Sequence, residues 1–382
     1  MADFSALTGR PCPEWYRTPQ LGIFIHWGIF AIPAFAPRGT SIAELTRNDY
    51  DNLFACAPYA EWYANALRIP ESETARRHAA KYGARPYASF RQEFEEAAAE
   101  FDANQWAELF VAAGARYVVF VTKHHDGFCL WPTDVENPHA PGWHSRRDFV
   151  GELAEAARCR GLKFGVYYSG GLDWTFRDTP IRDLGDMFAC VPIEKDYADY
   201  AEAQIRELIA RYKPAVLWND IAWPDEVRLP RLFADYYTAV PDGVVNDRWM
   251  GNVGLLSALR DPAARTSFND TIKKRIREAE GELESPPPQH CDFRNVEYAS
   301  GKAMGDKKWE STRGLGLAFG YNANEQTEDY LTGAALIELY NDVTSRGGNL
   351  LINVGPRADA SIPEVQSAPL VQLGKYLSPQ RR

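Results

Sequence analysis

The sequence contains no hydrophobic run of about 18 residues, so it predicts no membrane-spanning helix. Positive charge is in the minority, because 42 lysines and arginines face 52 aspartates and glutamates, for a net charge of −10. An acidic chain disfavours nucleic acids and anionic membranes as main partners. The N-terminal segment MADFSALTGR has neither a basic nor an apolar stretch. We therefore expect a cytoplasmic protein, although a secreted chain without its signal would look the same.

Cysteine is scarce, and its spacing is unlike that of a metal or redox centre. No two cysteines form a CxxC pair. We expect all of them to be free thiols, as is usual in reducing compartments. The six are Cys12, Cys56, Cys129, Cys159, Cys190 and Cys291.

Short apolar runs alternate with amphipathic helical stretches, without internal repeats or low-complexity linkers. This alternation predicts a parallel α/β sheet, and about eight strands suit one TIM-like (β/α)8 barrel that spans residues 1–382. An open doubly wound sheet is the alternative, but its usual glycine-rich phosphate turn is missing after residues 21–27. We expect strands at 21–27, 116–122, 163–168, 215–219, 244–246, 296–298, 315–319 and 349–354. We expect helices at 101–114, 148–160, 197–212, 232–240, 273–284, 334–344 and 365–377.

Two long segments interrupt the alternation, residues 31–89 and residues 251–291. Each follows the C-terminal end of an expected strand, where TIM barrels build their active sites. Long loops in compact domains are usually functional or disordered. We therefore expect both to be insertions on the active-site side, the second partly helical and close to the mouth of the site.

Polar and aromatic side chains stand at the C-terminal ends of six expected strands. If the barrel forms, these side chains meet on one rim, which is the residue-level case for an enzyme. The aromatic content of 13% fits a sugar site, where flat rings stack on pyranose faces, as well as a large core. The strand-end residues are His26, His124, His125, Asp126, Tyr167, Tyr168, Asp220, Asn246, Asp247, Arg248, Trp249, Glu297 and Tyr298.

The histidines of this set could ligate a metal, as in metal-dependent barrel hydrolases. Those enzymes usually carry an H-x-H pattern after the first strand, whereas Trp27 and Gly28 follow His26 here. Adjacent residues on an extended segment point opposite ways, so His124 and His125 are poorly placed to chelate one ion unless the strand has ended before them. We expect no metal, and we assign the histidines to hydrogen bonds with sugar hydroxyls or to structural roles.

Hydrolysis of a glycoside requires two carboxyl groups, one as nucleophile or base and one as acid. Asp220 is the candidate nucleophile because it ends the rigid apolar run AVLWN, and capping a turn is its alternative role. Glu297 is the candidate acid because it lies in a strand-like run, and a salt bridge to Arg248 or Arg294 is its alternative role. The fallback acids are Glu282, Glu284 and Glu310, the last of which we expect to orient a loop.

A set of motifs resembles the α-L-fucosidases of glycoside hydrolase family 29: LGIFIHWG, AEWYANALRI, TKHHDGFCLW, RRDFVGELAEAARCRGLKFGVYYSGGLDW, PAVLWNDIAWP, VNDRW and KKWESTRGLGLAFGYN. The resemblance implies a (β/α)8-like barrel that hydrolyses terminal α-L-fucosides with retention and needs no cofactor. It implies Asp220 as nucleophile and Glu297 as acid/base, although a valine precedes Glu297 where the family usually has alanine or proline. The fucose-binding groups that it implies are His26, Glu61, Trp62, His124, His125, Tyr167, Trp218, Arg248 and Phe319.

Family members commonly carry a β-sandwich after the barrel, whereas only residues 378–382 follow the last expected helix here. We therefore expect a barrel without that C-terminal β-sandwich. The expected partners are fucosylated oligosaccharides or glycoconjugates, with no nucleic acid and no membrane, and a homo-oligomer is compatible with the sequence. The alternatives are an inactive carbohydrate-binding barrel, a metal-dependent barrel hydrolase, and a retaining glycosidase for another 6-deoxy or galacto-configured sugar. The pair of candidate carboxyls counts against the first of these.

Overall fold

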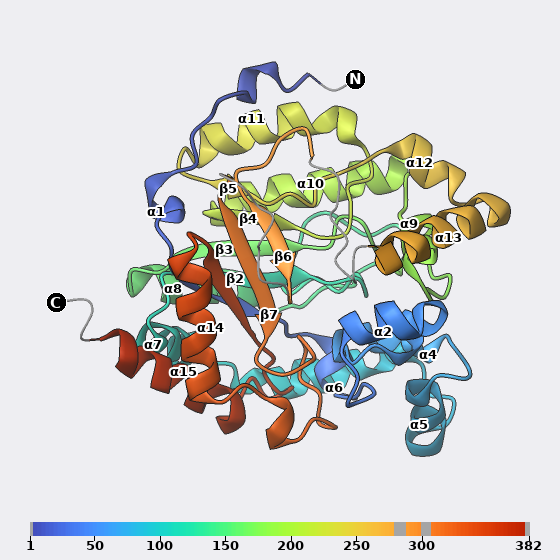
Figure 1. The fold of residues 1–382 in the computed structure, drawn as a ribbon, viewed down its shortest axis with the longest axis horizontal. Helices are drawn as coiled ribbons and strands as arrows, with labels where there is room; N and C mark the ends of the chain where they lie inside the picture. Colours follow the sequence, from blue (N-terminus) through green and yellow to red (C-terminus); the bar gives the residue numbers. More distant parts are fainter. Residues whose placement is uncertain (1–2, 279–287, 299–306, 379–382) are drawn as a thin grey trace.

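The computed structural model describes residues 3–278, 288–298 and 307–378, and its centre is a parallel sheet of eight strands (Figure 1). Strands that are adjacent in the sheet are also consecutive along the chain, except that β1 pairs with β8, as in a barrel. This curled parallel sheet confirms the predicted (β/α)8 fold class. The strands are β1 (Leu21–Ile25), β2 (Tyr117–Lys123), β3 (Lys163–Tyr168), β4 (Val216–Asn219), β5 (Val244–Val245), β6 (Arg294–Glu297), β7 (Trp309–Gly314) and β8 (Asn349–Val354).

The seam between β5 and β6 is bridged partly by side chains instead of a full backbone ladder. The Asp292 backbone N–H donates to the Val245 carbonyl at 3.0 Å, and the Asp292 carboxylate accepts the Val245 N–H at 2.8 Å. The Asp247 carboxylate accepts the Asn295 N–H at 3.1 Å. Two aspartates therefore satisfy backbone donors that would otherwise be left without partners where the sheet curls round on itself.

Helices cover the outside of the barrel (Figure 1), where α7, α8, α10 and α11 pack on each other in turn, as do α14, α15 and α7. Helix α7 packs against both α8 and α15, and a Cβ on Gly374 of α15 would collide with the Ala112 carbonyl of α7. No helix within the described ranges is long and apolar enough to cross a membrane. The outer helices are α7 (Ala103–Ala113), α8 (Phe149–Cys159), α10 (Lys195–Tyr212), α11 (Leu229–Ala239), α14 (Gly333–Ser345) and α15 (Glu364–Leu377).

Apart from the partly exposed β6, the strands are largely buried on both faces, which explains why most of them read as continuous apolar runs. Outward residues such as Ile23 and Val118 pack under the helices, in the largest core cluster. Inward residues such as Phe24, Tyr167 and Trp218 form a separate cluster inside the barrel. The first five predicted strands match β1 to β5, and the last one matches β8, within a few residues.

The prediction of a strand at residues 315–319 is wrong, because the seventh strand is β7 (Trp309–Gly314). Its sequence, WESTRG, is polar and therefore does not resemble a buried strand. Glu310 and Thr312 are nevertheless 0% and 1% exposed, and hydrogen bonds inside the barrel satisfy them. Residues 315–319 instead form a loop after β7.

Further helices lie before β1 and in the segments after β1, β3 and β5. The structure places α13 against both α9 and α2, so the segments after these three strands support one another. The expected helix at 273–284 overlaps α13, and residues 279–287, which include Glu282 and Glu284, lie outside the described residues. These further helices are α1 (Glu14–Arg17), α2 (Ile42–Asn48), α3 (Leu53–Cys56), α4 (Tyr63–Leu67), α5 (Glu73–Tyr82), α6 (Phe90–Ala97), α9 (Leu184–Ala189), α12 (Val253–Ala258) and α13 (Pro262–Glu278).

Candidate active site

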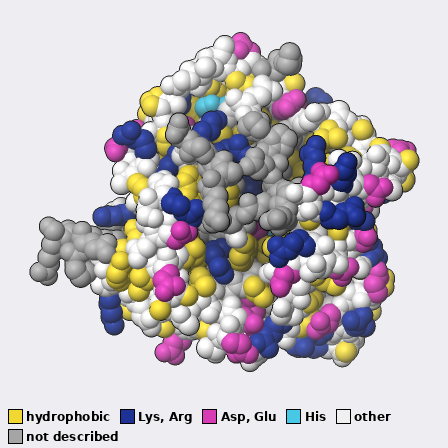
Figure 2. Space-filling view, in the orientation of Figure 1, with side chains coloured by type: hydrophobic (Ala, Val, Ile, Leu, Met, Phe, Trp, Pro, Cys, Tyr) yellow, Lys and Arg dark blue, Asp and Glu magenta, His cyan; other side chains and the backbone are white. Residues whose placement is uncertain are grey.

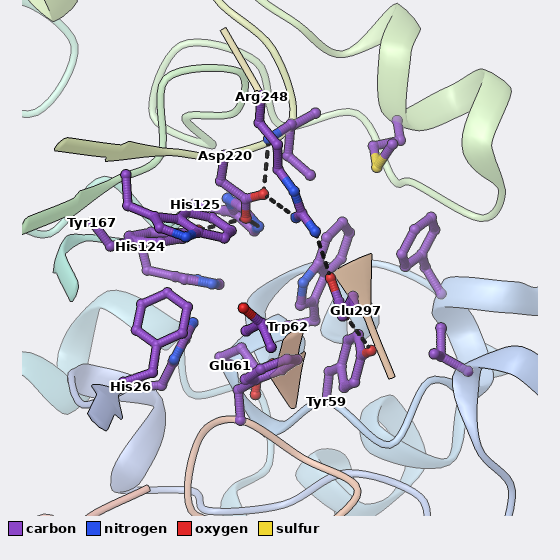
Figure 3. Close-up of a pocket in the computed structure, with 18 of the residues that line it drawn as sticks. His26, Tyr59, Glu61, Trp62, His124, His125, Tyr167, Asp220, Arg248 and Glu297 are labelled. Carbon is purple, nitrogen blue, oxygen red and sulfur yellow. Dashed lines mark hydrogen bonds and ion pairs between the residues drawn. The ribbon is translucent and has the colours of Figure 1, made fainter. Parts of the chain in front are cut away.

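A pocket of about 240 Å³ opens at the C-terminal ends of the strands (Figure 3). Every residue that the sequence analysis assigned to catalysis or to fucose binding lines this pocket, and these residues come from strands and loops far apart along the chain. Two of the other strand-end residues bind partners outside the pocket: the Asp126 carboxylate accepts the Tyr87 hydroxyl at 2.7 Å, and the Tyr168 hydroxyl donates to Gln204 at 2.9 Å. The predicted residues in the pocket are His26, Glu61, Trp62, His124, His125, Tyr167, Trp218, Asp220, Arg248, Glu297 and Phe319.

Asp220 follows β4 directly and is held as a carboxylate. Its Oδ2 accepts the Tyr167 hydroxyl at 2.7 Å, and its Oδ1 accepts Nη1 of Arg248 at 2.7 Å. Burial opposes ionisation, but the Arg248 charge and the hydrogen bonds from Tyr167 and Arg248 together hold the pKa of Asp220 below its ordinary value. An ionised carboxylate at the end of a rigid strand has the properties of a nucleophile.

Glu297 ends β6 and faces Asp220 across Arg248 (Figure 3). Its Oε2 accepts Nη2 of Arg248 at 3.0 Å, and its Oε1 accepts the Tyr59 hydroxyl at 2.9 Å. The side chain of Glu297 is 29% exposed, against 12% for Asp220. The salt bridge foreseen as an alternative role therefore exists with Arg248, whereas Arg294 pairs with Asp247 at 2.6 Å. Partial exposure gives Glu297 access to water and to a leaving group.

The backbone turns sharply after each of these two carboxylates. Ile221, which follows Asp220, has φ 67°, and Tyr298, which follows Glu297, has φ 52°. A left-handed conformation is costly for any non-glycine residue and most of all for a β-branched one. The Ile221 N–H donates to Asp220 Oδ1 at 2.9 Å, so this strained turn also helps to orient the carboxylate.

Three histidines form one wall of the pocket. His26 is hydrogen-bonded through Nδ1 to Asn353 at 2.7 Å, and His125 through Nδ1 to Ser169 at 2.6 Å. The rings of His124 and His125 lie 4.0 Å apart, centroid to centroid, and both line the pocket. The expectation that these neighbours point apart held only for a continuing strand, and it does not apply because β2 ends at Lys123.

The three imidazoles are neutral at neutral pH. Burial lowers the pKa of His26 to about 4, against smaller opposing effects of Asn353 and Asp220. Burial also lowers the pKa values of His124 and His125 well below their ordinary range, and neighbouring positive charge adds to the effect. Nδ1 of His124 is buried without a hydrogen-bond partner among the described residues. Neutral imidazoles can both donate to and accept from hydroxyl groups.

Another part of the pocket wall comes from the segment after β1 and the loop after β7. Glu61 accepts the Gly320 N–H at 2.8 Å, and burial raises the pKa of Glu61 to about 8. Trp62 stacks on Phe54 with ring centroids 4.3 Å apart. Phe319 comes from the loop at residues 315–319 and packs near His26, with ring centroids 5.0 Å apart. Residues 31–89 and the loop after β7 thus contribute side chains to the pocket.

The sequence did not single out several residues that orient this site. Tyr59 contacts Glu297, Asn353 contacts His26, and Ser169 contacts His125. Asn353 could have been found, because it is a polar residue near the end of the apolar strand β8, as the other candidates are. Tyr59 gave no such signal, since it lies in a loop 238 positions away from its partner.

No group of three or more histidine, cysteine, aspartate or glutamate side chains within the described ranges could hold a metal ion. The pocket instead presents paired carboxylates, neutral imidazoles and aromatic rings. Charged groups with exact hydrogen-bond geometry and flat apolar faces are the features by which proteins recognise sugar hydroxyls and pyranose rings.

Residues 2–381 match the model of the family described as Alpha-L-fucosidase. The chain belongs to the α-L-fucosidase family. The alpha-L-fucosidase of Dictyostelium discoideum is 29% identical over 97% of this chain and 71% of its own length. The human tissue alpha-L-fucosidase is 28% identical over 98% of this chain and 70% of its own length.

Solved structures of the family agree with this assignment. The Thermotoga maritima alpha-fucosidase in complex with a mechanism-based inhibitor is 41% identical and has a TM-score of 0.79, over 98% of this chain and 76% of that one. An alpha-L-fucosynthase of the same organism, in complex with alpha-L-Fuc-(1-2)-beta-L-Fuc-N3, is also 41% identical and has a TM-score of 0.81 over the same shares. The chain is thus a glycoside hydrolase family member with the family's catalytic barrel.

The protonation of Glu61 can be tested through stability. Its pKa is about 8 when folded and about 4.3 when unfolded, so between these values the folded state holds a proton that the unfolded state has lost. This stabilising contribution is complete below about pH 4 and is lost as pH rises through 8. The free energy of unfolding of the wild type, minus that of Glu61→Gln, should fall by about 1.4 kcal/mol per pH unit between pH 5 and pH 8.

Urea unfolding of both proteins at pH 5, 6, 7 and 8 measures this difference. Burial also raises the pKa of Glu325 to about 7 and that of Asp126 to about 6, but both residues are present in both proteins and cancel. A difference that stays constant over this range would show that Glu61 is already ionised in the folded protein.

Proposed function

We propose that this protein is an exo-acting α-L-fucosidase that cleaves terminal α-L-fucosides with retention of configuration. Family membership supports the substrate, and the contact of Arg248 with both Asp220 and Glu297 is the observation that carries the mechanism. Retaining enzymes hold their two carboxyls about 5–5.5 Å apart, whereas inverting enzymes leave about 6.5–9.5 Å for a water molecule. One guanidinium that bridges both groups favours the shorter separation.

In the first step Asp220 attacks the anomeric carbon while Glu297 gives its proton to the leaving oxygen. Asp220 is suited to attack because its charge is retained by Arg248 and its orientation is fixed by Tyr167 and the Ile221 N–H. The product is a covalent fucosyl ester on Asp220, and the aglycone departs with the proton from Glu297.

In the second step Glu297 removes a proton from water, which attacks the ester and releases fucose. Formation of the ester removes the negative charge of Asp220, so the positive charge of Arg248 then acts on Glu297 alone. Arg248 therefore stabilises the Glu297 carboxylate at the stage when it must act as a base. No cofactor is required for either step.

The pocket walls account for recognition of the sugar. We assign hydrogen bonds with the fucose hydroxyls to the three neutral histidines and to Glu61, and apolar contacts with the ring and its methyl group to Trp218 and Phe319. Trp62 completes the wall beside His125, with ring centroids 5.0 Å apart. A volume of about 240 Å³ supports binding of one terminal sugar, which is why we propose exo action.

We assign the aglycone to the outer part of the pocket, toward the two long segments. Side chains of α2, α3 and α9 line this part, and α13 of the segment 251–291 packs behind α2 and α9. Most of these side chains are apolar, and on the face shown in Figure 2 acidic and basic side chains are intermixed over the described surface. Both features support an uncharged glycan as partner. The residues are Ile42, Thr46, Leu53, Phe54, Leu184 and Met187.

We also propose a cytoplasmic location. All six cysteines are free thiols in the structure, which supports a reducing compartment.

The proposed nucleophile is tested with Asp220→Gly and an aryl α-L-fucoside. Turnover should fall by at least about 10⁴-fold, because no other group can form the covalent intermediate. Added azide should restore part of the activity and yield a fucosyl azide of inverted configuration, since azide fits where the carboxylate was. Near-normal turnover, or rescue without the inverted product, would remove Asp220 from this role.

The proposed acid/base is tested with Glu297→Ala and two substrates that differ in leaving group. A fucosyl disaccharide should react about 10²–10⁴-fold more slowly than with the wild type, because its poor leaving group needs the proton. Formation of the fucosyl-enzyme from an activated aryl fucoside should slow much less. Equal losses for both substrates would contradict the role, and Tyr59→Phe, which keeps the carboxyl but removes one hydrogen bond to it, is the matched control.

A further inference from the structure

A buried carboxylate lies inside the barrel beneath the pocket. Glu310 is on β7, is 0% exposed and does not line the pocket. Its Oε2 accepts the hydroxyls of Tyr16 at 2.6 Å and Tyr117 at 2.5 Å, and its Oε1 accepts Nε1 of Trp218 at 3.1 Å. No lysine or arginine in the described parts of the chain forms an ion pair with it. Hydrogen-bond donors are therefore its direct partners, and the charge of Lys308 adds a smaller favourable effect without forming an ion pair with it.

The surrounding sequence makes room for this arrangement. Tyr117 reaches the barrel interior only because its neighbour across the β1–β2 ladder is Gly22, where a Cβ would collide with the Tyr117 ring. Tyr16 comes from the short helix α1, far from β7 along the chain. Two buried tyrosines and one glycine thus support one oxygen of Glu310, while its other oxygen faces the pocket floor.

That other oxygen is connected to the reacting groups by two routes. Trp218 lines the pocket, and its ring stacks on Tyr167, which donates to Asp220, with centroids 5.4 Å apart. The Arg248 guanidinium lies over the Trp218 ring, 4.9 Å from its centroid. Fixing the indole N–H therefore fixes the surface on which both Tyr167 and Arg248 rest.

The second route passes through Asn295. Its amide nitrogen lies 3.4 Å from Glu310 Oε1 and donates to Thr312 at 2.6 Å, which orients the amide group. Its amide oxygen then accepts Nη2 of Arg248 at 3.0 Å, the same nitrogen that contacts Glu297. The direction of the Asn295 amide, and with it the position of Arg248, depends on the acceptors at positions 310 and 312 together.

We propose that Glu310 is a positioning residue of the catalytic site, which holds the indole of Trp218 directly and the guanidinium of Arg248 through Asn295. This inference rests on the proposed function, because it assigns Glu310 to the support of Arg248, Asp220 and Glu297. It also excludes Glu310 as the acid catalyst, since a fully buried carboxylate below the pocket floor cannot touch the leaving oxygen. Its position near the start of β7, inside the barrel, corrects the expectation that it orients a loop.

The decisive variant is Glu310→Met, which keeps the approximate size of the side chain but removes both acceptor oxygens. The hydrogen bonds that Tyr16, Tyr117 and Trp218 donate to Glu310 are then all lost. We expect kcat/KM to fall about 10- to 100-fold, by the same factor for an aryl fucoside with a good leaving group and for a fucosyl disaccharide. Trp218→Phe, which keeps an aromatic ring but removes the N–H, should lower kcat/KM by a similar factor for both substrates.

A double-mutant cycle separates positioning from a general loss of stability. If Glu310 acts through Trp218, the variant with both changes should be less than about 3-fold worse than the poorer single variant, because the two effects share one route. The matched control is Gln204→Leu, which removes another fully buried hydrogen bond, to Tyr168, away from the pocket. Gln204→Leu should lower the midpoint of thermal unfolding, but below that temperature its kcat/KM should equal that of the wild type.

If Glu310→Met does not fold, Tyr16→Phe removes one donor to the same carboxylate and should give a smaller, leaving-group-independent loss of about 2- to 10-fold. A larger loss for the poor leaving group would overturn the proposal and make Glu310 the acid. Wild-type kinetics in Glu310→Met or in Tyr16→Phe would also overturn the proposal, and so would multiplicative losses in the double-mutant cycle. A wild type without activity on fucosides would instead contradict the proposed function.

Discussion

The Arg248 guanidinium determines the geometry of this site, because one planar group is hydrogen-bonded to both Asp220 and Glu297. A bidentate guanidinium fixes direction as well as distance, which a lysine could not do. The contact also has a cost, since a buried cation between two carboxylates is stable only if its own surroundings are rigid. The rest of the pocket floor meets this requirement: Trp218 lies under the guanidinium and Asn295 accepts its second nitrogen.

The barrel fold brings the residues of this site together. Parallel strands bring their C-terminal ends to one rim, so residues separated by more than 200 positions meet without long excursions of the backbone. Burial then divides the polar groups of the rim into two kinds. Asp220 is kept ionised by Arg248, whereas burial keeps the histidines and Glu61 neutral, because their hydrogen bonds and nearby charges oppose it only in part. A charged nucleophile among neutral hydrogen-bonding groups suits attack on an uncharged sugar.

Strand ends were predictable from the sequence, because a polar residue after an apolar run is a local signal. His26, Tyr167, Asp220 and Glu297 were found in this way, and the resemblance to the family added Glu61 and Phe319. The sequence failed where burial and polarity coincide: β7 was missed because Glu310 and Thr312 face the barrel interior with hydrogen-bond partners from distant segments. Contacts of this kind, like that of Tyr59 with Glu297, are set by tertiary structure and leave no local pattern.

The central claim is that hydrolysis passes through a covalent ester on Asp220, and trapping this ester tests it most directly. Incubation with a 2-deoxy-2-fluoro-α-L-fucosyl fluoride should form the ester readily but hydrolyse it slowly, because the fluorine destabilises both oxocarbenium-like transition states and the good leaving group compensates only in the first. Peptide mass mapping should then place a single fluorofucosyl group on Asp220. A label on Glu297 or on another residue, or turnover of the reagent without any adduct, would contradict this account.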